Sequence, residues 1–206
     1  MEEAKFNNLC SHYKDTFDVH LASIKQRDTL FYGLLIVLAV FTLQLSSTEV
    51  VANVVGEYVN KTTGIELGNN IDFVSTLLWF LLLGFTTRYF QVVLEIERQY
   101  DYLHVLEEKL NSFYSNSRAF TREGESYLSK YPLFSSWVWF LYTVFFPILI
   151  LFCVIMRIIS EIEVIESIKV NQTINFTCFI IVGISSFLYM YRLHESGIEN
   201  LIKRWR

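Results

Sequence analysis

Residues 71–113 read IDFVSTLLWFLLLGFTTRYFQVVLEIERQYDYLHVLEEKLNSF, and this stretch decides the fold. Its first half, 71–91, is apolar and long enough to cross the hydrocarbon core of a bilayer, which takes about 20 residues of helix. Its second half is rich in charge and contains neither Gly nor Pro, so nothing in it ends a helix. The pattern predicts one long helix that begins in lipid and continues into the cytosol.

Two apolar stripes are predicted to pack together outside the membrane. In the charged half of the stretch, apolar residues recur at spacings of three and four, which places them on one face of a helix. They are Ile96, Tyr100, Leu103, Leu106, Leu110 and Phe113. The N-terminal segment carries a similar stripe, formed by Phe6, Leu9, Tyr13, Phe17, Leu21 and Ile24. This segment is less basic than helices that bind anionic lipid, so we expect it to pack against the first stripe.

Four apolar blocks separated by charged segments indicate a polytopic membrane protein. Of the 206 residues, 52% are hydrophobic and only 18% are charged, and the charges lie mostly between the blocks. We therefore predict an all-α fold with four transmembrane helices in a single domain. In chain order its segments are a cytosolic amphipathic helix (1–28), the first span (29–48), an outer loop (49–70), the second span (71–91), a cytosolic helical segment (92–131), the third span (132–156), a second outer loop (157–172), the fourth span (173–191) and a cytosolic tail (192–206).

The basic residues predict that both termini lie in the cytoplasm. With the N-terminus inside, all but three of the 17 Lys and Arg residues fall in inner segments, and the outer loops hold Lys61, Arg157 and Lys169. Such an excess on the cytoplasmic side is the rule for multi-pass proteins. Side chains that anchor the spans at the headgroups are expected at the inner boundary. They are Arg88, Tyr89, Tyr131, Trp137 and Tyr191.

The central portions of the predicted spans contain no charged residue. Because pumps and coupled transporters bind ions through buried ionisable groups, this argues against secondary transport. Gln44, Thr86 and Asn175 either line a narrow pore in an oligomer or form hydrogen bonds between helices. The second interpretation is favoured, because such bonds are common in membrane bundles. Pro147 is expected to kink the third span or to open its hydrogen-bond ladder.

No catalytic, cofactor-binding or metal-binding residues are predicted. The four histidines are scattered and lack the paired spacing of helical metal sites. The carboxylates between Glu95 and Glu108 fit a solvated helix face with ion pairs, which is a simpler interpretation than acid–base catalysis. The same helix carries the candidate partner-binding residues Arg98, Tyr100, Tyr102 and His104.

Composition and layout suggest a bacterial membrane protein without enzymatic activity. Phe, Ile, Tyr, Asn and Ser are frequent while Ala, Gly and Pro are rare, which is typical of an AT-rich bacterial genome and indicates the inner membrane. The layout is similar to that of small four-span bacterial proteins, including membrane components of phage-defence systems. We expect a sensor or effector subunit of defence type. The alternatives are a small oligomeric channel or transporter subunit and a lipid-acting membrane enzyme.

The physical basis of this expectation is the long helix that joins lipid to cytosol. A displacement of residues 100–113 by a binding partner would be carried along the same helix into the bilayer. The expected partners are the lipid bilayer and either further copies of the chain or a cytosolic protein. No cofactor and no nucleic acid are predicted.

Overall fold

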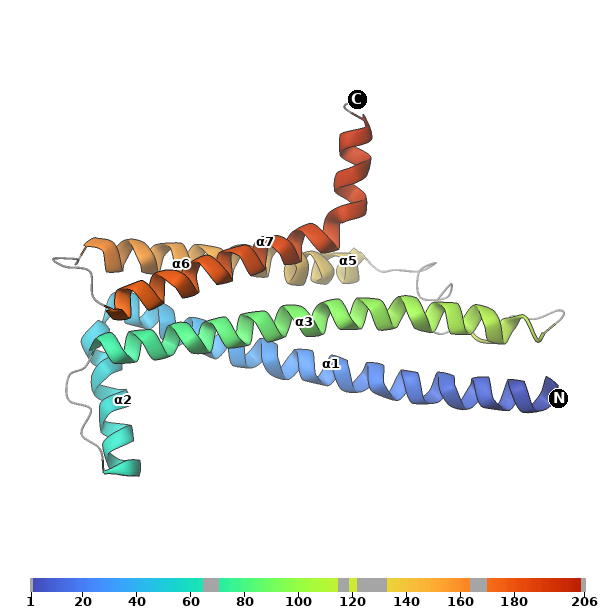
Figure 1. Cartoon of the computed structure of the whole chain (residues 1–206), viewed down its shortest axis with the longest axis horizontal. Coiled ribbons are helices and arrows are strands. Elements are labelled where there is room, and N and C mark those ends of the chain that lie inside the picture. The colour runs from blue at the N-terminus through green and yellow to red at the C-terminus, as the bar shows by residue number, and fades with distance from the viewer. Residues whose placement is uncertain (1, 65–70, 115–118, 122–132, 164–169, 205–206) are drawn as a thin grey trace. The chain divides into compact units, whose positions relative to one another are not determined.

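The computed structural model describes residues 2–64, 71–114, 119–121, 133–163 and 170–204. The elements in these ranges, drawn in Figure 1, are all helical: α1 (Glu2–Ser46), α2 (Thr48–Thr63), α3 (Ile71–Asn111), α5 (Leu133–Phe140), the π-helical η1 (Leu141–Phe145), α6 (Phe146–Glu163) and α7 (Val170–Arg204). Four helices among the described residues are long and apolar enough to cross a membrane: Glu2–Ser46, Asp72–Asn111, Ser136–Ile162 and Val170–Glu195. The prediction of an all-α fold with four such helices is confirmed.

Helix α3 is one uninterrupted helix of 41 residues, as its sequence predicts. At about 1.5 Å per residue it extends for roughly 60 Å, which is about twice the thickness of a hydrocarbon core. The helix continues through Arg88–Gln91, where the apolar half meets the charged half. Aromatic and straight-chain residues fill this junction, and the single Gly of the helix, Gly84, lies within the apolar half.

Helix α1 is also continuous and has 45 residues. We predicted its two halves as an amphipathic helix followed by a span, and the structure joins them into one helix. The reason lies in the sequence, because the first Gly of the chain is Gly33 and the first Pro is Pro132. Like α3, helix α1 is therefore about twice as long as a membrane span requires.

A π-helical turn ends two residues before Pro147. This turn, η1, lies between α5 and α6. A proline has no N–H to donate, and its ring crowds the carbonyl four residues earlier, here that of Thr143. The wider π-helical turn relieves this conflict, so the hydrogen-bond ladder opens where Pro147 predicts.

The third and fourth candidate spans continue beyond the segments that hydropathy assigned to them. Helix α6 runs past Met156 to Glu163, through residues that we assigned to the second outer loop. Helix α7 runs to Arg204 and takes in most of the segment assigned to the tail. As a result, Arg157 and Glu161 lie on the same helix as the apolar residues that precede them.

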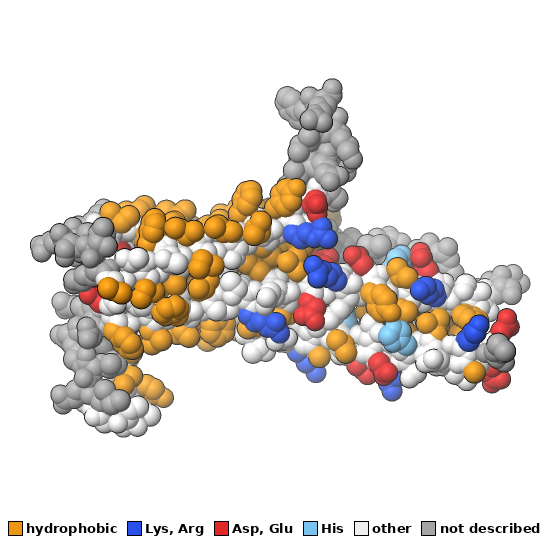
Figure 2. Space-filling model, in the orientation of Figure 1, with side chains coloured by type: hydrophobic (Ala, Val, Ile, Leu, Met, Phe, Trp, Pro, Cys, Tyr) orange, Lys and Arg blue, Asp and Glu red, His pale blue; other side chains and the backbone are white. Residues whose placement is uncertain are grey.

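The chain divides into two compact units. The hairpin unit comprises Met1–Thr29 and Gln91–Leu141, and the bundle unit comprises Leu30–Phe90 and Tyr142–Arg206. Helices α1 and α3 each contribute one part to each unit. Figure 2 shows many charged side chains over the helices of the hairpin unit and mainly hydrophobic side chains over those of the bundle unit.

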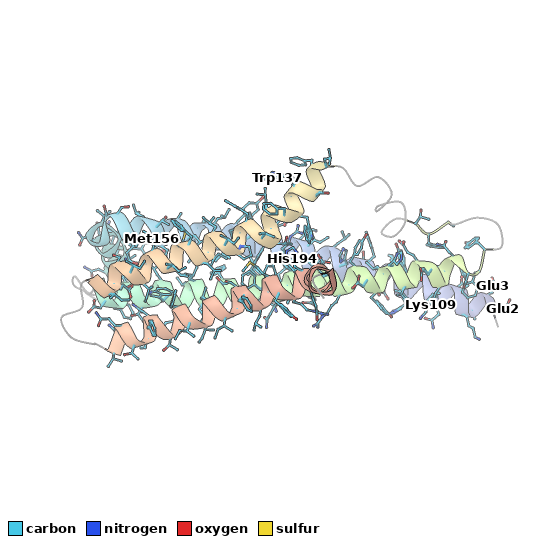
Figure 3. All side chains as sticks on the ribbon, turned by 90° about the horizontal axis from the view of Figure 1, so that it is seen from above. Glu2, Glu3, Lys109, Trp137, Met156 and His194 are labelled. Carbon is cyan, nitrogen blue, oxygen red and sulfur yellow. The ribbon has the colours of Figure 1, made fainter. Side chains whose placement is uncertain are left out.

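In the hairpin unit, α1 and α3 run antiparallel, so that the start of α1 lies beside the end of α3 (Figure 1). Glu2, Glu3 and Lys109 lie toward this end, as Figure 3 shows. The ring of Phe6 meets that of Phe113 there, with 5.4 Å between the centroids. The two helices therefore pair up to the end of α3.

Hydrogen bonds and a buried seam hold this helix pair together. The Tyr13 hydroxyl donates to Glu107 at 2.8 Å, and the Gln99 amide donates to the Ser23 hydroxyl at 3.1 Å. Along the same stretch of α3, three seam residues are buried: Leu103, Leu106 and Leu110. The N-terminal stripe therefore packs against this seam, as predicted.

One position of the N-terminal stripe differs from the prediction. Leu21 is 42% exposed, whereas His20 and Ser23 are buried. The buried face is therefore displaced by about one residue around the helix at this point. The Ser23 hydroxyl accepts a hydrogen bond from Gln99 and donates one to the Val19 carbonyl, so a polar side chain fits this face with its hydrogen bonds satisfied.

In the bundle unit, each of the four long helices turns one apolar edge inward. The buried side chains recur at spacings of three and four along each helix. They include Leu34, Val37 and Phe41 on α1, Leu78 and Leu82 on α3, Ile150 and Val154 on α6, and Cys178 and Val182 on α7. Ile36, Phe152 and Ile184 are exposed apolar side chains, an arrangement expected where lipid covers the outside.

Gly33 allows α1 and α3 to approach closely within the bundle unit. A Cβ atom at Gly33 would lie only 2.5 Å from Cε1 of Phe85 on α3, which is closer than real side chains come. Small residues at such contacts are common in membrane bundles, where close packing draws helices together. At Gly84 and Gly183, nothing lies within 4 Å of an added Cβ atom.

We predict that Gly33→Ala destabilises the protein and that Gly84→Ala does not. The methyl group at position 33 has to displace the Phe85 ring, and overpacking of this kind costs about 1–3 kcal/mol. At position 84 the methyl group enters open space, and alanine gains up to about 1 kcal/mol of helix propensity over glycine. Thermal unfolding in detergent, followed by circular dichroism, should show a lower midpoint for the first variant alone. Equal midpoints would contradict the close approach.

Candidate functional site

A buried ion pair on α6 is the main polar feature of the bundle unit. Arg157 and Glu161 are four residues apart, so both side chains lie on one face of the helix. Arg157 Nε lies 2.9 Å from Glu161 Oε1, and the two side chains are only 5% and 14% exposed. A charge pair withdrawn from water needs further hydrogen bonds, because its mutual attraction alone does not offset the cost of desolvation.

Three side chains from two other helices supply hydrogen bonds to Glu161. On α3, Ser75 Oγ donates to Oε1 at 2.8 Å, and Trp79 Nε1 donates to the same oxygen at 3.1 Å. On α7, Asn175 Nδ2 donates to Oε2 at 2.9 Å. Together with Arg157, four donors reach the carboxylate, which is about the number that its two oxygens accept.

Arg157 connects this cluster to the end of α1. Its Nη2 donates to Ser75 Oγ at 2.9 Å, and its Nη1 donates to the backbone carbonyl of Gln44 at 3.4 Å. Gln44 lies in the last turn of α1, where carbonyls have no N–H partner within the helix. Because α1 has no basic residue in its own last turn, Arg157 supplies the cation that interacts favourably with the helix dipole.

All four long helices therefore meet in one polar network. Helix α1 contributes a backbone carbonyl, α3 a serine and a tryptophan, α6 the ion pair and α7 an asparagine. Ser75 is central, because its hydroxyl donates to Glu161 and accepts from Arg157 and, at 3.5 Å, from Asn175. Ser75, Trp79 and Asn175 are at most 4% exposed.

The geometry of this network suits the fixing of helices better than the binding of a ligand. Both oxygens of Glu161 are already engaged by donors, and the Trp79 ring packs perpendicular to that of Phe41 at 4.9 Å. In the described part of the chain, no group of three or more His, Cys, Asp or Glu side chains could hold a metal ion. Buried polar networks rigidify a packing arrangement and specify it where their groups are paired. Both oxygens of Glu161 are paired here, whereas Asn175 Oδ1 has no partner among the described residues.

The three polar residues predicted within the spans are all buried, and two of them contribute to the network. Asn175 forms hydrogen bonds between helices, which is the interpretation favoured from the sequence. Gln44 contributes its backbone carbonyl, and its side chain is fully buried. Thr86 is fully buried about three turns along α3 from Ser75, and its hydroxyl has no hydrogen-bond partner among the described residues.

The predicted headgroup anchors differ in their exposure. Three have exposed side chains, as residues at an interface need: Arg88, Trp137 and Tyr191. Tyr89 is fully buried instead, with its ring 5.5 Å from that of Phe146 between centroids. It is a core residue of the bundle unit, because its side chain does not reach the surface. Tyr131 lies outside the described residues.

The predicted partner-binding residues lie on two different faces of α3 in the hairpin unit. Residues four apart share a helix face and residues two apart do not. Arg98 and Tyr102 form the exposed pair, and the Tyr102 hydroxyl lies 2.8 Å from Nε2 of His12. Tyr100 and His104 form the second pair and are half-buried. The first pair is therefore the more accessible to a partner.

Reasoning from the sequence did not identify Arg157 and Glu161 as site residues. Hydropathy placed both in an outer loop, because they follow the end of an apolar block. Two signals in the sequence point to them. Their spacing of four favours an ion pair on a helix, and the polar residues Ser75 and Asn175 lie near the matching ends of neighbouring apolar blocks.

Comparisons with protein-family models, with curated proteins and with solved structures found no match. The class of protein therefore follows from the fold and the site alone. The chain is an all-helical protein with four candidate membrane spans, whose ends are joined by a buried ion-pair network.

We predict that breaking the ion pair destabilises the protein far more than removing it. Arg157→Met or Glu161→Gln alone leaves a buried charge without its partner, which costs about 3–5 kcal/mol. The double variant removes both charges, so it should recover most of that loss. Thermal unfolding in detergent measures the three variants against the wild type.

The exposed ion pair Glu57–Lys61 on α2 serves as the control. It has the same spacing and a distance of 3.1 Å, but its side chains are 71% and 76% exposed. Exposed pairs contribute at most about 1 kcal/mol, so Glu57→Gln should leave the unfolding midpoint nearly unchanged. If single variants of Arg157 and Glu161 were no more harmful than this control, the network would not be what holds the bundle.

Proposed function

We propose that this chain is a non-enzymatic integral membrane protein that couples a cytosolic pair of helices to a membrane-spanning bundle. In this proposal it serves as a sensor or effector subunit of the bacterial inner membrane, of the kind used in defence against phage. The observation that carries the proposal is the continuity of α1 and α3, which both pass from one unit into the other without a break. A displacement of the hairpin unit therefore acts on two helices of the bundle at once.

The packing of the hairpin unit supports this role. Because α1 and α3 share a buried seam, a partner that moves one of these helices also moves the other. Arg98, Tyr102 and Val105 recur at spacings of four and three and are exposed on α3. We propose this surface as the docking position for a cytosolic protein or for a second copy of the chain.

The proposal places the paired parts of α1 and α3 in the hairpin unit, together with both termini, in the cytoplasm. The excess of Lys and Arg in the inner segments supports this orientation. Arg157, one of the three basic residues assigned to the outer side, is buried in its pair with Glu161 and adds no free charge there. Lys61 and Lys169 are then the basic residues of the outer loops.

Cysteine labelling in intact cells tests the orientation. In a background without the native cysteines, we predict that a membrane-impermeant maleimide labels Glu57→Cys on α2 before the cells are permeabilised. Asn7→Cys on α1 should react only afterwards, since the proposal places it inside. Both positions are exposed, so accessibility of the side chain itself does not limit the reaction. The opposite order of labelling would overturn the proposed orientation.

A small oligomeric channel or transporter subunit is the second candidate. Thr86 and Ser186 favour it, because both are fully buried in the bundle unit and their hydroxyls have no partner among the described residues. Hydrogen-bond donors and acceptors line selective paths through membrane proteins, and because these two hydroxyls are buried within the bundle, such a path would run through the bundle itself. Glu161 contributes little to such a path, since the protein already occupies its oxygens.

Controlled expression in bacteria tests the effector function. We predict that induction of the wild type lowers the membrane potential, measured with a potential-sensitive dye, and slows growth. At equal protein level, Leu106→Ala should weaken this effect several-fold, because it opens a cavity in the buried seam. Val19→Ala alters an exposed apolar residue of the helix pair that lies outside the proposed docking surface, and it should weaken the effect less.

The outcome also separates the two candidate functions. No change in potential after induction or under phage challenge would count heavily against an effector. A channel predicts that the purified protein passes ions in liposomes without a partner. It also predicts that Gln44→Leu stops this flux while Leu106→Ala leaves it in place.

A further inference from the structure

Helix α2 is a complete helix that is separated from the end of α1 by a single residue. Ser47 forms the junction between the two helices. At the far end of α2, Gly64 has a φ of 70°, a left-handed conformation that favours glycine, and its N–H donates to the carbonyl of Asn60. This arrangement is a common way to end a helix. Helix α2 is therefore an element of its own and not an extension of α1.

Helix α2 runs across the direction of the long helices in the bundle unit, as Figure 1 shows. Its first turn is held by the bundle, because Val51 is only 4% exposed. A helix that lies across a set of membrane spans runs along the plane of the membrane. The direction of α2 is therefore that of a helix on a membrane surface and not that of a further span.

An apolar stripe is exposed along α2. Val50, Val54 and Tyr58 are spaced by four residues and share one face, and they are 52%, 62% and 71% exposed. Asn53 and Asn60 are exposed on another face. Two faces of this kind on one helix are typical of helices that lie in the interface of a bilayer.

The polar network indicates how deep in the bilayer α2 begins. The Gln44 carbonyl that Arg157 binds lies two residues before the end of α1. Charged groups are most costly at the centre of a bilayer, so the network belongs near the headgroups. Helix α2 therefore starts at the boundary between acyl chains and headgroups, where an apolar stripe reaches lipid on one side and water on the other.

We infer that α2 lies in the membrane interface with Val50, Val54 and Tyr58 inserted among the acyl chains of the adjacent leaflet. Its partner is the lipid surface itself. Tyrosine suits this position, because its ring is apolar and its hydroxyl reaches toward the headgroups. Lys61 is exposed near the end of the helix and pairs with Glu57 at 3.1 Å, and its long side chain allows this charged pair to remain at the headgroups. The inference holds whichever side of the membrane faces the cytoplasm.

Spin labels on the full chain in lipid vesicles test this placement. After replacement of the three native cysteines by alanine, single labelling sites are introduced on the two faces of α2. They are Val54→Cys and Tyr58→Cys on the stripe, and Asn53→Cys and Asn60→Cys on the polar face. All four positions are exposed, so the label does not disturb a packed core. We expect collisions with oxygen to exceed those with a water-soluble nickel complex several-fold on the stripe, and the reverse on the polar face.

Two results would overturn the inference. Equal nickel exposure at all four positions would mean that α2 stands in water. Low collision rates with both reagents on the stripe would mean that protein covers it, and cross-linking of Val54→Cys between copies would identify that protein as a second copy. A further measurement adds a charge beside the label. Val54→Asp should raise the nickel exposure at position 58 several-fold, whereas Asn53→Asp should not.

Discussion

The Glu161 carboxylate is the group on which the arrangement of the bundle depends. A carboxylate away from water is stable only where a positive charge and hydrogen-bond donors surround it. Helix α6 itself supplies one of the four donors, from Arg157, and the others come from α3 and α7. Because each donor has a fixed place on its helix, a slide by one turn, about 5.4 Å, would leave the buried charge short of partners.

Apolar packing specifies such a register poorly in lipid, since acyl chains are as apolar as the side chains that they touch. The aromatic rings of the bundle unit are an example of apolar packing. Phe31 lies 4.8 Å from Phe146, and Phe90 stacks on Tyr189 at 4.1 Å between centroids. Such contacts add stability beyond the area they bury, but they tolerate small shifts. The network therefore sets the register, and the rings fill the space between the helices.

The sequence was sufficient wherever a feature depends on neighbouring residues along one helix. The unbroken α3 and the buried Leu103 and Leu106 follow from spacings of three and four, which are a local property. The partners of Glu161 do not, because Ser75 lies 86 positions away and their pairing depends on which helices become neighbours. Tyr89 shows the same limit. Its place at the end of a span is typical of an anchor, and helix packing alone decides that its ring turns inward.

The register set by the network restricts how a displacement passes along α3. Ser75 and Trp79 lie in its first turns and are bound to Glu161. A push along the axis, or a large rotation about it, pulls these donors away from a buried charge. A tilt of α3 that pivots at Ser75 preserves these hydrogen bonds and shifts the ring contacts of Tyr89 and Phe90 instead. Ring contacts depend less strongly on orientation than hydrogen bonds do. In the proposed function, a change driven through α3 would therefore act first on the packing around those rings.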